Sequence, residues 1–177
     1  RIGWYRSVNA VHHGYAIGSF VDELAAAAGK DPLEFLLALI GPDRQVDLSQ
    51  AGLVPPASNY GASWTDHPMD SARAKGVLRL AAEKSGWGGA LPKGRGRGIA
   101  MHRSFLSYVA MVVEVEVKPD GTVLVPRATV AVDAGFIAEG SEELDAAGGA
   151  AFRRGAAELG CEERGGRGGE SLRLQSL

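Results

Sequence analysis

The feature that most constrains the fold is a pair of valine-rich segments joined by a short turn. Within residues 108–117, valines alternate with Glu114 and Glu116, and this period of two is typical of a strand with one buried and one solvated face. Residues 118–121 supply the Pro, Asp and Gly of a tight turn, and residues 122–133 return as a second strand. The pattern predicts an antiparallel hairpin with buried valines and solvated glutamates.

Three helices are expected ahead of this hairpin. The first covers residues 16–28, in which Phe20, Leu24 and Ala28 are spaced four apart and would form its apolar face. Residues 1–15 are aromatic and polar, so we expect them to be an ordered loop that leads into the helix.

The second expected helix, over residues 32–40, has clear local start and stop signals. Asp31 can cap its N-terminus, Pro32 suits its first turn, and Gly41 and Pro42 follow its last residue. Its residues are apolar on most sides, which predicts a buried helix.

The third expected helix covers about residues 71–85, with Asp70 as its cap and Gly86 as its stop. Residues 92–98 follow as a basic, glycine-rich loop, and residues 99–104 should form or approach a strand beside the hairpin. The order of these elements predicts an α+β fold, with helices followed by an antiparallel hairpin.

The composition changes abruptly at residue 139. The 39 residues 139–177 contain nine Gly, five Arg and eight acidic residues but no Val, Ile, Thr, Pro, Lys, Tyr or Trp, whereas the 30 residues before them contain nine Val. We therefore divide the chain into a partial domain, residues 1–138, and an atypical tail, residues 139–177. Within the tail, residues 162–171 are expected to be unstructured, and residues 150–159 have a helical composition.

Charge and cysteine content exclude several classes of protein. Lys plus Arg number 19 and Asp plus Glu number 21, so the net charge is −2 and a protein that coats phosphates is not expected. No apolar stretch approaches the roughly 20 residues of a membrane span, and no signal peptide is visible. The single Cys161 can form no internal disulfide and cannot hold an iron–sulfur cluster.

No complete catalytic or metal-binding constellation is visible either. The adjacent His12 and His13 would point about 100° apart on a helix and lack a third ligand at metal-site spacing. The Gly-x-Gly-x-Gly segment at 94–98 differs from a dinucleotide fingerprint, which leaves a close approach to a ligand or a flexible surface loop as alternatives. The RGG-like repeat at 164–169 resembles RNA-binding tracts, but the net acidity of the tail argues against nucleic acid.

Several motifs nevertheless occur in the order found in one enzyme family. They are Gly3-Trp4-Tyr5-Arg6-Ser7-Val8-Asn9, Ser19-Phe20-Val21-Asp22-Glu23-Leu24, Asp31-Pro32-Leu33-Glu34, Gly94-Arg95-Gly96-Arg97-Gly98-Ile99-Ala100-Met101-His102-Arg103-Ser104-Phe105, Glu114-Val115-Glu116-Val117 and Val132-Asp133-Ala134-Gly135. With them, residues 1–138 resemble the molybdopterin-binding large subunit of the xanthine dehydrogenase/aldehyde oxidase family. The most similar branch is the isoquinoline 1-oxidoreductase beta-subunit type.

The resemblance implies that the chain is part of a larger molybdopterin-binding domain. Enzymes of this family hydroxylate N-heterocycles or aldehydes with oxygen from water. The pterin, expected in its cytosine dinucleotide form, holds the molybdenum, so no metal ligand from this chain is expected. The implied partners are the remainder of the large subunit and a separate small subunit that carries the iron–sulfur clusters.

The resemblance also assigns site residues position by position. Arg6 matches an arginine near the molybdenum centre, with Ser7 beside it, and Val8 and Asn9 would line the substrate pocket. Four further positions are expected to contact the cofactor: Gly96, Gly98, His102 and Arg103.

Two departures from the family pattern affect the expected activity. The Asn-Pro, Gln and Glu-Gly that follow the Asp-x-Gly turn in the family are missing after Ala138, and the chain ends before the Gly-x-Gly-Glu segment that carries the catalytic Glu. We therefore expect a fragment without a catalytic base, with a tail that stems from a shifted reading frame or a mispredicted end. The start at Arg1 also indicates a piece of a longer protein. The alternatives are a non-enzymatic binding module, which would use the Gly-Arg loop and the RGG-like tail, and an inert truncated product. The compartment is left open.

Overall fold

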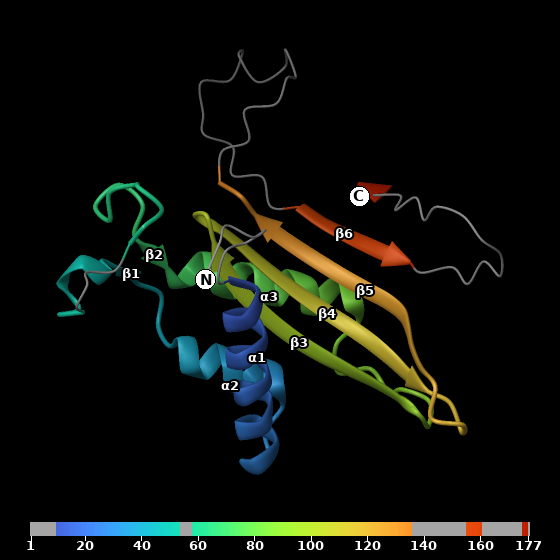
Figure 1. The fold of residues 1–177 in the computed structure, drawn as a ribbon. Coiled ribbons are helices and arrows are strands. Elements are labelled where there is room, and N and C mark those ends of the chain that lie inside the picture. The colour runs from blue at the N-terminus through green and yellow to red at the C-terminus, as the bar shows by residue number, and fades with distance from the viewer. Residues whose placement is uncertain (1–9, 54–57, 136–154, 161–174, 177) are drawn as a thin grey trace, which may run out of the picture.

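The computed structural model describes residues 10–53, 58–135, 155–160 and 175–176. The helices are α1 (Ala10–Ala27), α2 (Pro32–Ile40) and α3 (Ser71–Ser85), with a 3₁₀ turn at Leu48–Gln50. The strands are β1 (Gln45–Val46), β2 (Met69–Asp70), β3 (Arg95–Ser104), β4 (Ser107–Val117), β5 (Val123–Asp133), β6 (Gly155–Gly160) and β7 (Gln175–Ser176). The fold is α+β, as predicted: three helices precede an antiparallel sheet (Figure 1).

The predicted caps of α2 and α3 are confirmed. The Asp31 carboxylate accepts hydrogen bonds from the backbone N–H groups of Leu33 and Glu34, and Asp70 caps α3 in the same way. Gly86 ends α3 in the left-handed conformation, with φ of 68°. The expectation that α2 is buried is wrong, because none of its residues is fully buried and Leu39 is 60% exposed.

Helix α1 differs from its prediction in both its start and its buried face. It begins at Ala10, so residues 10–15 are helical and do not belong to a loop. Its buried residues are Val21 and Ala25, whereas Phe20 is 61% exposed. A Cβ added at Gly18 would lie 3.3 Å from the Ala100 Cβ, so α1 approaches β3 through its small residues. This close approach turns Phe20 away from the protein.

The predicted hairpin is confirmed as β4 and β5, which pair from Tyr108↔Asp133 to Val117↔Val123. Strand β3 pairs with β4 along its whole length, from Arg95↔Glu116 to Ser104↔Ser107. The expected loop at 92–98 is therefore wrong for residues 95–98, which form the first part of β3. Its glycines do not interrupt the strand, because β4 supplies a continuous set of backbone partners.

The core lies between the sheet and α3, which runs behind β4 and β5 in Figure 1. Five apolar strand residues on this side are at most 7% exposed: Ile99, Tyr108, Ala110, Val112 and Ala131. The expected orientation of the hairpin is wrong, since Glu114 shares this side and is only 7% exposed, while Val117 is 49% exposed. The alternation itself is present, but α3 covers the face that carries the glutamates.

Two short strands extend the sheet beyond β5, in the order β3-β4-β5-β6-β7. Residues 155–160 pair with Arg127–Val132 as β6, so this part of the helical segment expected at 150–159 is a strand. The backbone groups on the outer edge of β5 offer the hydrogen bonds that favour a strand there. The remaining segments of the tail lie outside the described residues.

Candidate functional site

The structure divides the described site residues between the two faces of β3. Along a strand, alternate residues point to opposite sides. Gly96, Gly98 and His102 therefore share the face that α3 does not cover, whereas Arg103 points to the other face. Arg6, Ser7, Val8 and Asn9 lie outside the described residues, so their assignment stays a prediction.

His102 lies beneath the start of α1. A Cβ added at Gly14 would lie 3.7 Å from the His102 ring, an ordinary van der Waals distance, so α1 passes directly over this ring. Burial lowers the pKa of His102 below its ordinary value of 6.5, and the charge of His13 lowers this pKa further. The imidazole is therefore mostly neutral at pH 7, when it can both donate and accept a hydrogen bond.

Arg103 holds a surface loop onto the end of the sheet. Its Nη2 donates to Asn59 Oδ1 at 2.9 Å and to the His67 carbonyl at 3.4 Å, and its guanidinium lies over the rings of Trp64 and Tyr108. Its Nε is buried without a hydrogen-bond partner. The side chain thus has one unused donor but is otherwise committed to contacts within the chain.

The turn next to Arg103 carries backbone strain. Within the described ranges, the non-glycine residues with positive φ are Tyr60, Phe105 and Leu106, and the Tyr60 and Phe105 rings stack with centroids 4.6 Å apart. Phe105 and Leu106 form the two-residue link between β3 and β4, where the right-handed twist of the strands favours turns with positive φ. Packing holds these bulky residues in a conformation that glycine or asparagine would adopt more easily.

A buried ion pair fixes the end of β5, and sequence reasoning missed it. Asp133 is fully buried, and its carboxylate accepts from Arg73 Nη2 at 2.8 Å and Nε at 3.2 Å. The Arg73 guanidinium lies 4.6 Å from the Tyr108 ring centroid, and the Tyr108 hydroxyl accepts from the Asp70 N–H at 2.7 Å. Because side chains alternate along each strand, Asp133 was predictable on the same face as Tyr108, and a carboxylate on a buried face could have indicated an ion pair. This network fixes the direction in which the chain leaves β5.

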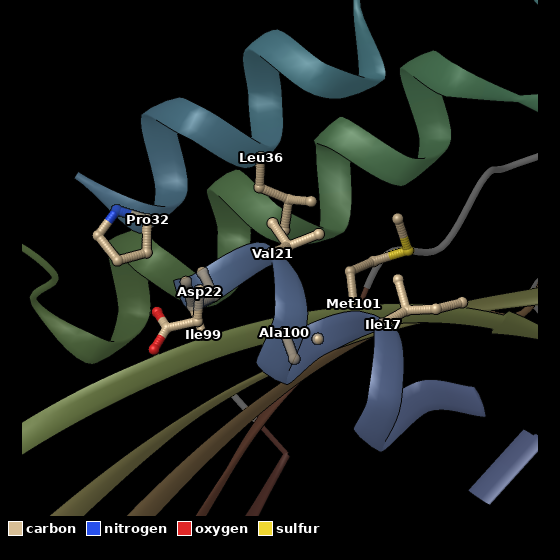
Figure 2. A pocket seen from close by; sticks show the side chains of 9 residues that line it. Ile17, Val21, Asp22, Pro32, Leu36, Ile99, Ala100 and Met101 are labelled. Carbon is tan, nitrogen blue, oxygen red and sulfur yellow. The ribbon is translucent and has the colours of Figure 1, made fainter. Parts of the chain in front are cut away.

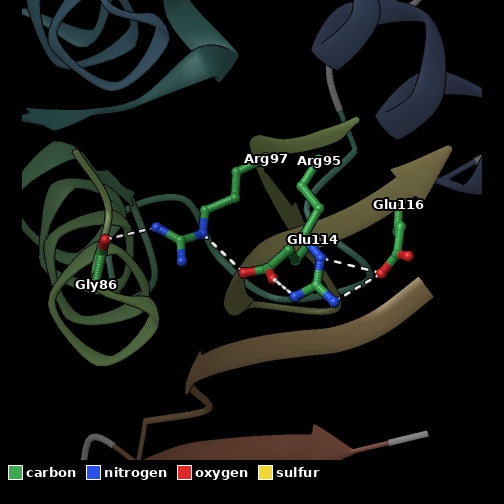
Figure 3. Close-up of polar contacts among 5 residues, drawn as sticks. All are labelled: Gly86, Arg95, Arg97, Glu114 and Glu116. Atoms are coloured by element: carbon green, nitrogen blue, oxygen red, sulfur yellow. Dashed lines mark hydrogen bonds and ion pairs between the residues drawn. The ribbon is translucent and has the colours of Figure 1, made fainter. Parts of the chain in front are cut away.

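A second ion-pair network occupies the predicted Gly-Arg loop (Figure 3). Glu114 accepts from Arg97 Nε at 3.0 Å and Arg95 Nη1 at 3.3 Å, while Glu116 accepts from Arg95 Nη2 at 2.7 Å. Arg97 also donates to the Gly86 carbonyl at 2.7 Å. Both arginines are therefore neutralised by the hairpin, and the expectation of a solvated Glu114 is wrong because it is the shared acceptor.

The best-formed cavity lies between α1, α2 and β3 and has a volume of about 20 Å³ (Figure 2). Its lining is mostly apolar and includes Val21, Leu36, Ile99 and Met101, with Asp22 as its charged member. This volume suits about one water molecule. It cannot hold a pterin or an organic substrate.

The described residues provide neither a metal site nor a membrane-crossing helix. No group of three or more His, Cys, Asp or Glu side chains there could hold a metal ion. In the same part of the chain, no helix combines the length and apolar character that a membrane crossing requires.

Comparison with known proteins finds sequence similarity between the chain and two dehydrogenases. Over 148 residues it is 32% identical to a subunit of the nicotinate dehydrogenase of Pseudomonas putida KT2440, a match covering 77% of this chain and 11% of that protein. Over 145 residues it is 30% identical to the membrane-bound aldehyde dehydrogenase (pyrroloquinoline-quinone) of Gluconacetobacter polyoxogenes, covering 78% of this chain and 17% of that protein. No protein-family model matches the chain, and no solved structure does. The chain is thus related to a small part of much longer oxidoreductases.

Proposed function

We propose that the chain is part of the molybdopterin-binding large subunit of a molybdenum hydroxylase that acts on N-heterocycles or aldehydes with oxygen from water. The observation that carries this proposal is the 148-residue match to a nicotinate dehydrogenase subunit, because nicotinate is an N-heterocycle. The name of the second relative adds an aldehyde dehydrogenase. The two names cover the two substrate classes that the motifs imply.

The described residues alone do not fit a pterin. A bound pterin with its pyrophosphate needs several converging hydrogen-bond donors. Arg95 and Arg97 are already paired with glutamates, and Gly96 and Gly98 lie in a paired strand that forms no cradle. The buried Nε of Arg103 is a single donor on the opposite side of β3 from His102.

We therefore assign this chain a scaffolding role in the larger protein. Its helices and sheet would support one side of the cofactor domain, and Arg6 and Ser7 would bring the first cofactor contacts. Most contacts, including those to a cytosine dinucleotide, and the catalytic base would come from the remainder of the large subunit. Iron–sulfur clusters would be carried by a small partner subunit, as the resemblance of residues 1–138 implies, and the single Cys161 of this chain cannot hold one.

The test begins with the gene. Its nucleotide sequence, read in all frames from before codon 1 to about 1 kb beyond codon 177, should restore Asn-Pro, Gln, Glu-Gly and a later Gly-x-Gly-Glu after codon 138. If no frame restores them, the catalytic interpretation is wrong.

The restored protein, purified with its partner subunit, should contain molybdenum and release a cytosine nucleotide on acid treatment. With an added electron acceptor to take the two electrons, it should also oxidise nicotinate to a hydroxylated product or an aldehyde to an acid, with one ¹⁸O from labelled water in the product. Pyrroloquinoline quinone without molybdenum would instead support the cofactor in the name of the second relative. The 177-residue chain alone should show no turnover.

A binding module is the competing interpretation, and the structure removes one of its two supports. Arg95 and Arg97 point toward glutamates of the neighbouring strand, so they present little net positive charge to a nucleic acid. The RGG-like repeat lies outside the described residues. A filter-binding titration of the full chain with single-stranded RNA should therefore show no tight, salt-sensitive binding.

A further inference from the structure

One face of the sheet carries an apolar surface that no described element covers. On β4 and β5, the cross-strand pairs on the side away from α3 form three rows: Val109 with Val132, Met111 with Val130, and Val113 with Ala128. We call these six residues the open face. Met111 is 38% and Val132 is 36% exposed, whereas Ala110 and Ala131, their neighbours on the α3 side, are completely buried.

The composition of the open face is that of an interface rather than of a solvated surface. None of its six side chains is charged, while the charged strand residues Glu114 and Arg127 lie on the opposite side. Two of the six side chains are exposed and the other four are half-buried, and a contiguous apolar surface that is not fully buried marks a contact site. The valine pattern thus indicates a second buried face, for which the described residues supply only part of the cover.

Helix α1 provides that part. It packs over β3 through Gly14 and Gly18, against His102 and Ala100. Figure 1 shows α1 crossing β3, with β4 and β5 extending beyond it. The open face, defined on the two strands β4 and β5, therefore begins directly beside α1.

These dimensions match one helix. Two neighbouring strands span about 10 Å, which is the diameter of a helix with its side chains. The three rows are two residues apart, so they extend over about 14 Å, the length of about nine helical residues. On the other side of the same strands, the 15-residue helix α3 makes the same kind of contact through Val77, Leu78 and Ala81.

We propose that an amphipathic helix from the rest of the longer polypeptide docks on the open face beside α1 and contacts it through about two and a half turns of uncharged side chains. This inference rests on the proposed function for one point only, namely that the chain is a small part of a long subunit. The relatives support this point, because the chain spans 11% and 17% of their lengths. A sheet covered by helices on both faces would result.

The test compares one substitution in two contexts. Met111→Lys keeps the length of the side chain and places a charge at the centre of the open face. The matched control is Val123→Lys, which adds the same charge to β5 outside the three rows, at a residue that is 61% exposed. Each variant is made in the 177-residue chain and in the complete reading frame that contains it.

In the complete protein, Met111→Lys should lower the soluble yield at least tenfold, and Val123→Lys should leave it within twofold. In the 177-residue chain, Met111→Lys should leave the circular dichroism spectrum and urea midpoint unchanged and reduce the fluorescence of bound anilinonaphthalene sulfonate severalfold.

Three results would overturn the proposal: a complete protein that tolerates Met111→Lys, a 177-residue chain that this substitution unfolds, or a 177-residue chain that dimerises until Met111 is changed. The last result would assign the open face to a second copy. These measurements report folding and assembly, so they can succeed or fail independently of molybdenum content and turnover.

Discussion

The buried pair of Arg73 and Asp133 gives the sharpest test of how this fold is held together. Asp133 is completely buried, and the Arg73 side chain is 20% exposed. We predict that Asp133→Ala destabilises the chain by about 3–5 kcal/mol, because it leaves a largely buried guanidinium without its carboxylate. A domain of this size has a total stability of about 5–15 kcal/mol, so this loss is a large fraction of the total and should shift the unfolding midpoint clearly.

Replacing both partners should cost much less than replacing one. In Arg73→Met with Asp133→Val, no charge is left buried, and apolar side chains of similar size fill the space. We therefore expect the double variant to retain most of the stability, with a coupling free energy of at least about 2 kcal/mol between the two positions. The result also remains informative if the single variants fail to fold.

The assay is urea unfolding of the full chain, followed by far-ultraviolet circular dichroism, with stability taken from the midpoint and slope. The control is Glu116→Ala, which breaks a pair with Arg95 in which the two side chains are 31% and 36% exposed, so no buried charge is left unpaired and the effect should be far smaller. The reasoning is refuted if Asp133→Ala costs less than about 1 kcal/mol, or if the single effects simply add in the double variant.

Three further predictions follow from the same structure. Glu114→Gln should lower the free energy of unfolding by about 1.5–3 kcal/mol and Glu116→Gln by less than about 1 kcal/mol, because the first side chain is 9% and the second 31% exposed. Urea unfolding of the two variants measures the difference, and equal losses would contradict the burial argument. The folded chain binds a proton at His102 less readily than the unfolded chain, so the contribution of neutral His102 to stability should be fully present above pH 6.5 and decline as the pH falls toward the lowered pKa. Urea midpoints at several pH values measure this decline, which should be weaker in His102→Gln. Leu106→Gly should raise the free energy of unfolding by about 0.5–1 kcal/mol, because the relief of about 1–2 kcal/mol of left-handed backbone strain exceeds the entropy cost of glycine. An unchanged or lower thermal midpoint would show that the turn is not strained.

The helix caps and the hairpin were predictable from sequence for a local reason. Asp31 and Asp70 bond to N–H groups two and three residues along the chain, and Gly86 takes a conformation that depends on its own backbone. The turn between β4 and β5 is equally local. Interactions within a few residues depend little on the rest of the fold, so the sequence alone specifies them.

The faces of the elements were predicted less well. Phe20 was expected inside and is exposed, because α1 uses its glycines to approach β3. Glu114 was expected in solvent and is buried, because α3 covers its face and Arg95 and Arg97 neutralise it. In each case the deciding partner lies far away in the sequence.

The candidate site shows the same division. Sequence motifs selected Gly96, Gly98, His102 and Arg103, and the structure adds that a single strand carries them on two opposite faces. The spacing of residues in the sequence does not predict the Arg73–Asp133 pair, which joins residues 60 positions apart. It also does not predict that two arginines share one glutamate carboxylate as their acceptor.

The amino-acid sequence by itself determined where most of the helices and the central hairpin begin and end, since propensity, capping and turn chemistry act over a few residues. The tertiary structure decided which side of each element is buried and which charges are paired, because burial depends on how distant segments pack together.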